Sequence, residues 1–277
     1  MFDTTRSAAA LIRRKVTGAR RRLRYLTSSK TVESIPGVVE DKFRVNGQTI
    51  RFSYRPRSTG DRGVVGQVFG DLDCNVERWH QGMALREFGR VASQNGLTPL
   101  VIDAGANIGA SCRYFLASYP GIRVAAIEPE KVNCALLRMN CRGLAVDIIE
   151  GAIGGHAGEL ALMDPGLSDW GFRVAQHGAY SVSVQTPQQI LARYPRSEFV
   201  PFVFKIDIEG GEINLFEQGD SWFDEFPCLM IELHDWMLPG KRSAQPFLRA
   251  AVARDFDFIH RGENLFCFNN RLLEQFY

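Results

Sequence analysis

Short apolar runs that end in acidic residues recur along the chain. Residues 100–102, 124–127, 202–206 and 229–231 are almost wholly apolar, and each run leads into an aspartate or glutamate. Strands buried on both faces of a parallel sheet form runs of this kind. The segment 110–119 has helical character and stops at a Pro-Gly pair. The pattern therefore predicts an α/β fold in which parallel strands alternate with helices.

Alternating apolar and polar positions predict two antiparallel hairpins. The first covers residues 42–52, with Asn46 and Gly47 placed for a type I′ turn. The second joins residues 256–260 to 265–268 and is expected to close the main sheet. Between the first hairpin and the main sheet, residues 73–94 are predicted to be helical. The expected core positions of that helix are Trp79, Met83, Leu85 and Phe88.

The charge distribution sets residues 1–30 apart from the rest of the chain. The formal net charge is only +2, but nine of the 33 Lys and Arg residues lie in this segment, against one acidic residue. Apolar residues recur there at helical spacing, which predicts a basic amphipathic helix on an anionic membrane face, on nucleic acid or on a partner. A solvated tail or a helix packed on its own domain is the alternative. We expect three segments: a tail at 1–30, a hairpin and helical segment at 31–98, and a catalytic domain at 99–277.

Composition indicates a globular protein that folds without disulfide bonds or structural metal ions. The chain has 277 residues, 45% of them hydrophobic, and six cysteines with no C-x-x-C pair. We interpret the cysteines as reduced core residues. No run of 18 apolar residues is present, so neither a membrane span nor a secretory signal is expected. The expected location is the cytoplasm, with the tail as a peripheral contact to a membrane.

The segment D-A-G-A-N-I-G, from Asp103 to Gly109, follows the first apolar run and predicts a ligand-binding turn between strand and helix. A dinucleotide fingerprint needs a glycine where Asn107 stands, so a pyrophosphate fits poorly. S-adenosylmethionine has no phosphate and suits this turn better, since its amino and carboxylate groups can use Asp103 and backbone amides. The alternative is that Gly105 and Gly109 serve the turn geometry alone.

Acidic and basic residues at later strand ends extend the predicted site. Glu128 ends the second run, where a doubly wound sheet places the acid that holds ribose hydroxyls, although it could instead cap the helix near residue 131. Lys205, Asp207 and Glu209 alternate with isoleucines and, as a strand, would share one direction. His234 follows another strand and is expected to face the same crevice.

Together these motifs resemble the FkbM family of S-adenosylmethionine-dependent methyltransferases over residues 101–269. The matching motifs are D-A-G-A-N-I-G, I-E-P at 127–129, K-I-D-I-E-G-G-E at 205–212 and I-E-L-H at 231–234. The resemblance implies a Rossmann-like, doubly wound, seven-stranded class I methyltransferase sheet with an antiparallel C-terminal hairpin. It also implies that residues 73–94 lie over the cofactor. Gly211 departs from the family pattern, where a slightly larger residue is expected.

The resemblance also implies roles for individual residues. At the methionine end of the cofactor it places Asp103, Gly105, Asn107 and Gly109. It places Glu128 on the ribose, residues 151–153, including Ile153, at the adenine, and Asp207 near both cofactor and acceptor. Members methylate hydroxyls of sugars, glycans or polyketide-type natural products, so a sugar or glycan hydroxyl is the expected acceptor and another small natural product the alternative.

Methyl transfer to a hydroxyl needs alignment of the acceptor and help in removing its proton. His234 is the candidate base, with Lys205, Asp207 and Glu209 as the other candidate catalytic residues. The competing mechanism is a Mg²⁺ ion held by Asp207, Glu209 and Glu232 or Asp235. A noncatalytic module that binds RNA or a membrane through its tail is the alternative from a different class, and nucleic acid is not the expected partner.

Overall fold

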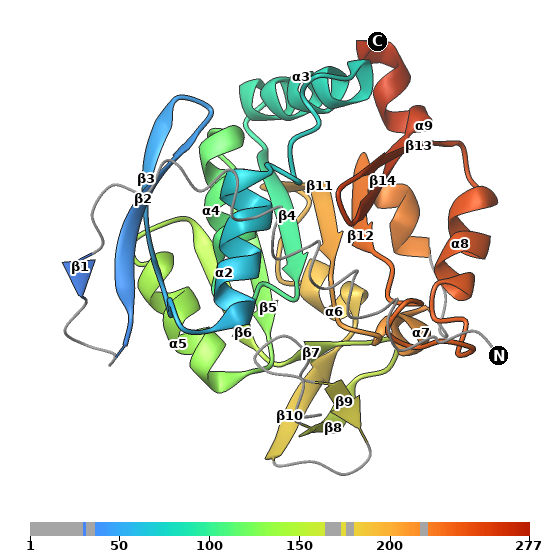
Figure 1. Ribbon diagram of the computed structural model, residues 1–277. Helices are drawn as coiled ribbons and strands as arrows, with labels where there is room; N and C mark the ends of the chain where they lie inside the picture. The colour runs from blue at the N-terminus through green and yellow to red at the C-terminus, as the bar shows by residue number, and fades with distance from the viewer. Residues whose placement is uncertain (1–29, 32–36, 164–172, 176–179, 217–220) are drawn as a thin grey trace, which may run out of the picture.

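A seven-stranded sheet forms the centre of the molecule (Figure 1). The computed structural model describes residues 30–31, 37–163, 173–175, 180–216 and 221–277. The strands of this sheet, in chain order, are β4 (Thr98–Ala104), β5 (Arg123–Glu128), β6 (Val146–Glu150), β11 (Phe199–Ile206), β12 (Cys228–Glu232), β13 (Phe256–Arg261) and β14 (Asn264–Asn269). Their spatial order is β13-β14-β12-β11-β4-β5-β6, with β14 antiparallel to both of its neighbours. The predicted fold class is confirmed.

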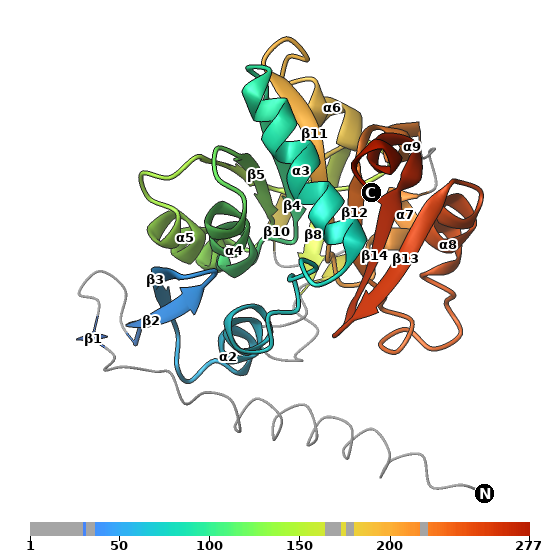
Figure 2. The same ribbon diagram turned by 90° about the horizontal axis from the view of Figure 1, so that it is seen from above.

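Helices cover both faces of the sheet (Figures 1 and 2). On one face lie α3 (His80–Gln94), α4 (Ala110–Ser118) and α5 (Lys131–Asn140); on the other lie α6 (Pro187–Leu191), α7 (Glu212–Leu215) and α8 (Gln245–Val252). Successive strand residues alternate between the two cores: Val101 belongs to the first, while Leu100 and Ile102 belong to the second. Burial on both faces explains why the strands are continuous apolar runs.

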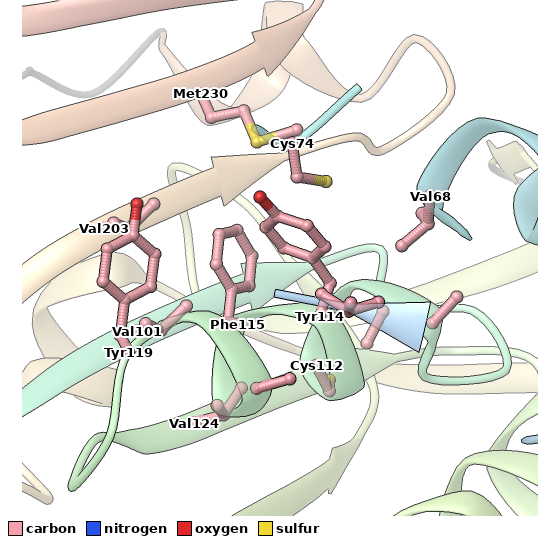
Figure 3. Close-up of a cluster of buried hydrophobic side chains, with 14 of the residues drawn as sticks. Val68, Cys74, Val101, Cys112, Tyr114, Phe115, Tyr119, Val124, Val203 and Met230 are labelled. Atoms are coloured by element: carbon pink, nitrogen blue, oxygen red, sulfur yellow. The ribbon is translucent and has the colours of Figure 1, made fainter. Parts of the chain in front are cut away.

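Figure 3 shows part of the first core, where side chains of α4 meet the sheet. The rings of Tyr114 and Phe115 from α4, together with Tyr119 at its end, lie among residues of β4, β11 and β12. Tyr119 packs edge-on against Phe202, with ring centroids 5.0 Å apart. Four of the six cysteines belong to the same cluster, and all six are buried and free, as predicted.

The N-terminal hairpin has the predicted turn. β2 (Val39–Val45) and β3 (Gln48–Tyr54) flank Asn46 and Gly47, whose φ angles of 47° and 80° suit a type I′ turn. A short strand, β1 (Lys30–Thr31), pairs with β2. The hairpin packs on α4 and α5, and Asn140 of α5 exchanges two hydrogen bonds with the backbone of Ser53. Its apolar residues join the first core, so the described part of the segment 31–98 is continuous with the main domain.

The segment between hairpin and sheet differs from the prediction. A helix, α2 (Thr59–Val65), and a π-helical segment, Gly66–Gly70, precede an irregular stretch, and α3 begins only at His80 rather than at residue 73. Leu85 is buried as predicted, but Met83 is 51% exposed, so its assignment to the core was wrong. Gly82 explains the tight entry to α3, because a Cβ there would lie 2.0 Å from the Val76 carbonyl oxygen.

A second sheet is inserted between β6 and β11. It has the order β7-β10-β8-β9 and consists of β7 (Ala152–Ile153), β8 (Gly158–Met163), β9 (Arg173–Ala175) and β10 (Tyr180–Gln185). A short helix, α9 (Asn270–Leu273), lies beside α3 and is followed by a single 3-10 turn, Glu274–Phe276. The basic tail at 1–29 and Trp170, considered as a possible wall of the acceptor pocket, lie outside the described residues. Within the described ranges, no helix combines the length and apolarity needed to cross a bilayer.

Candidate active site

The predicted glycine turn joins β4 to α4 at the point where the strand order reverses. Gly105 has a φ of 79°, and a Cβ there would lie 1.7 Å from the Asp207 carbonyl oxygen, so only glycine fits. Gly109 has a φ of 91° and precedes α4, where a Cβ would meet Leu137 of α5 at 2.7 Å. Gly105 thus permits the close approach of two strand ends, whereas Gly109 permits the packing of two helices.

A pocket that is partly open to solvent lies beside this turn. Parallel α/β sheets bind ligands at such a switch point, outside the carboxyl ends of the strands. The predicted site residues that line it are Gly105, Asn107, Glu128, Ile153, Asp207 and Glu209. Gly109, Asp103 and all of α3 are absent from the lining. The implied placement of residues 73–94 over the cofactor is therefore not seen at this pocket.

Glu128 ends β5 with its carboxylate in the pocket and is only 5% exposed. Its Oε2 accepts from the Asn107 N–H at 2.8 Å and its Oε1 from the Glu130 N–H at 3.0 Å. Burial raises the pKa of Glu128 to about 7, and these hydrogen bonds only partly offset that effect. The alternative in which Glu128 caps α5 is wrong, because the N-cap is Glu130, which accepts from Val132 and Asn133.

Lys205 links two carboxylates beneath the pocket. Its Nζ lies 3.4 Å from Asp103 Oδ1 and 3.2 Å from Asp207 Oδ2. Burial opposes the charge on Lys205, but the Asp207 and Asp103 carboxylates outweigh it and raise its pKa. Asp103 is fully buried and its other oxygen accepts from Ser111, so it braces Lys205 rather than facing the pocket. This differs from the predicted contact with the cofactor.

His234 lies where several carboxylates come together, but its side chain is buried and not exposed to the pocket as a general base would be. Only 1% of its side chain is exposed, and its Nδ1 lies 2.7 Å from Glu212 Oε1. Its Nε2 lies 3.6 Å from Asp207 Oδ1 and 3.7 Å from both Glu209 Oε2 and Glu232 Oε1. Burial opposes protonation of His234, yet the Glu212 hydrogen bond and the nearby carboxylates raise its pKa.

The carboxylates around His234 come together because the chain turns after β11, and not because side chains alternate along a strand. β11 ends at Ile206, and Glu209 has a left-handed φ of 52°. The prediction that Lys205, Asp207 and Glu209 project together from one strand is wrong, because only Lys205 belongs to β11, although Lys205 and Asp207 are in contact. The turn swings Glu209 toward His234 instead.

The sequence reasoning gave no role to the carboxyl groups of Glu212 and Asp73, and it considered Glu232 only as a possible Mg²⁺ ligand or orienting group. Glu212 begins α7 and is fully buried against His234; the K-I-D-I-E-G-G-E motif contained it, but its partner could not be inferred from spacing. Glu232 interacts with Glu263 in the β13–β14 turn, and burial, with Asp207 next in importance, raises the pKa of Glu232 to about 10. Burial also raises the pKa of Asp73 to about 6, with Asp71 contributing.

The strand order and the glycine turn at the switch point define a class I methyltransferase fold. The sequence matches the model of the "Methyltransferase FkbM domain" over residues 103–260, more than half of the chain. The chain belongs to the FkbM methyltransferase family and is a methyltransferase.

Solved structures of other methyltransferases share a remote similarity with this chain. The N-terminal domain of human METTL16 in complex with SAH is 11% identical, covering 94% of this chain and 93% of that chain with a TM-score of 0.40. A methyltransferase from Geobacter sulfurreducens is 14% identical over 68% of this chain and 78% of its own, with a TM-score of 0.35. A comparison with curated proteins gave no match.

Proposed function

We propose that this chain transfers a methyl group from S-adenosylmethionine to a hydroxyl of a sugar or glycan. The observation that carries the donor assignment is the carboxylate of Glu128 in the pocket beside the Gly105 turn. Each of its oxygens accepts one backbone N–H, Oε1 also accepts a long hydrogen bond of 3.5 Å from the Asn133 amide, and Oε2 has a second lone pair available. The two ribose hydroxyls of the donor are the groups that such a carboxylate would bind.

The rest of the pocket fits the same donor. Ile153 and the backbone of Gly151 line one end, which suits an adenine ring, and Gly105 and Asn107 line the other. When bound, S-adenosylmethionine supplies the methyl group and its positive sulfonium. The chain's own contribution is to hold the donor with Glu128 and to keep Asp207 in place through Lys205.

Asp207 and Glu209 form the acceptor side of the proposal. Their side chains are 29% and 26% exposed and line the same pocket, so they can accept hydrogen bonds from acceptor hydroxyls. This polar lining supports a polyhydroxylated acceptor over an apolar one. His234 is buried behind them, so we do not assign it to direct proton removal.

The test is incubation of the full chain with methyl-labelled S-adenosylmethionine and extracts of its source cells, followed by mass spectrometry. A label on a saccharide, lost with Asp207→Asn and retained with the surface variant Glu198→Gln, would support the proposal. A label on an apolar natural product would move the acceptor to that class. If calorimetry detects no binding of the donor, the donor assignment fails.

A further inference from the structure

Four side chains form a cluster at the acceptor end of the pocket: Asp207, Glu209, Glu232 and His234. Their atoms approach one another around His234 Nε2, which is buried and, within the described residues, has no hydrogen-bond partner. The three oxygens nearest to Nε2 lie at 3.6–3.7 Å, beyond hydrogen-bonding distance. A protonated Nε2 would therefore point a donor at three carboxylates without bonding to any of them.

Glu212 fixes which nitrogen of His234 faces the cluster. Its Oε1 lies 2.7 Å from Nδ1, so a proton on Nδ1 is donated to this buried carboxylate and Nε2 retains its lone pair. Histidines that bind metals commonly have their second nitrogen hydrogen-bonded to a carboxylate in this way. The lone pair of Nε2 and the oxygens of three acidic residues then point toward a common centre.

The spacing of the cluster suits an ion at that centre. Two ligand atoms that each lie about 2.1 Å from an ion are about 3.0 Å apart at a right angle and about 3.4 Å apart in a tetrahedral arrangement. The observed separations from Nε2 exceed these values slightly, and a candidate ligand set of Asp207, Glu232 and His234 lies within 4.8 Å overall. Small side-chain rotations would close the difference.

The charges around the cluster also favour a cation. Lys205 contacts Asp207, but it is shared with the fully buried Asp103. Glu209 adds a carboxylate next to His234, with Glu212 behind it. Negative groups therefore outnumber positive ones in a largely buried space, where an unbalanced charge is costly.

We propose that the cluster binds a divalent transition-metal ion, with His234 Nε2 as its nitrogen ligand and Asp207 and Glu232 as oxygen ligands. A mixed imidazole and carboxylate donor set suits Mn²⁺ and similar ions, whereas Mg²⁺ prefers oxygen ligands alone. Glu212 acts as a positioning residue through His234. The site stands independently of the acceptor; its use in the reaction, holding the acceptor hydroxyl beside Asp207, rests on the proposed function.

The test uses the full chain without a histidine tag, stripped of metal and titrated with Mn²⁺ in the absence of donor and acceptor. Electron paramagnetic resonance counts the bound ions, and pulsed measurements detect coupling to an imidazole nitrogen. His234→Asn and Asp207→Asn should each weaken binding at least tenfold, and Glu212→Gln by about 10–100-fold. The matched control is His260→Asn, which removes an exposed histidine on β13.

One Mn²⁺ per chain with nitrogen coupling, weakened by these variants and not by the control, is the expected result. The absence of bound Mn²⁺, or bound Mn²⁺ without nitrogen coupling, would overturn the proposal. The nitrogen coupling is measured on the unaltered chain, so it decides the question even if a variant fails to fold. Because no donor or acceptor is present, failure here leaves the proposed methyl transfer unaffected.

Discussion

The buried carboxyl of Glu128 should make the stability of the protein fall as the pH rises. In the folded chain its pKa is about 7, against an ordinary value of 4.5. The folded state therefore holds this proton more tightly than the unfolded chain. The resulting stabilisation is fully present below about pH 4.5 and is lost as the pH rises through about 7, a total of roughly 3 kcal/mol. Between pH 5.5 and 8.5 the change is about 2 kcal/mol.

Glu128→Gln removes this titration while keeping the shape of the side chain. The amide loses one of the two accepted backbone hydrogen bonds, a cost that does not depend on pH. Relative to the unaltered protein, the variant should therefore gain about 2 kcal/mol of unfolding free energy from pH 5.5 to 8.5. Other titrating groups occur in both proteins and cancel from the difference.

Urea unfolding at both pH values, followed by tryptophan fluorescence at constant ionic strength, measures this difference. The exposed Glu198→Gln is the matched control. A difference between Glu128→Gln and the unaltered chain that stays constant with pH would refute the reasoning. In that case the Asn107 and Glu130 amides stabilise the charged carboxylate enough to cancel its burial.

Three further predictions concern the same region. Glu128→Ala should weaken binding of S-adenosylmethionine by about 1.5–3 kcal/mol in calorimetric titration, and equal affinity of the variant and the unaltered protein would exclude a ribose contact. The unaltered protein should also bind S-adenosylmethionine more weakly as the pH falls below about 7, because Glu128 then takes up a proton. Gly105→Ala should destabilise the fold in denaturant titration by more than Gly143→Ala does. Both glycines have a positive φ, but only at Gly105 would a Cβ clash with a neighbouring atom. Gly143→Ala should cost about 1–3 kcal/mol. Lys205→Met should cost about 3–5 kcal/mol, since it removes the cation beside the buried Asp103 carboxylate. A loss below about 1 kcal/mol in the same titration would show that this ion pair contributes little to stability.

The main sheet was predictable because its strands are buried on both faces and carry an unmistakable apolar pattern. Gly105 and Glu128 were also predictable, because the close approach of strand ends and the end of β5 depend on local sequence. The helix α2 was not, since Gly60 and Gly63 within it are poor helix formers and tertiary packing overrides that propensity. The inserted sheet was missed because its short strands lack a long apolar run.

The candidate site was predictable in composition but not in detail. The sequence placed His234 near Asp207 and Glu209, and the structure brings them together. It could not show that Glu212 occupies one nitrogen of His234, because that contact depends on how α7 packs against the end of β12. The burial of Asp103 was likewise invisible, since strand spacing alone does not separate a pocket wall from the layer beneath it.

The central pair of strands, β4 and β11, has a consequence for synthesis of the chain. Thr98 of β4 pairs with Phe199 of β11, which lies far later in the sequence. During synthesis β4 therefore leaves the ribosome long before β11 is available to pair with it. During that interval an apolar strand flanked on one side by β5 presents an open edge, the kind of surface that recruits other chains. The many contacts between distant residues also predict slow folding. Production of this protein should therefore depend on translation rate and on chaperones more strongly than its well-filled cores would suggest.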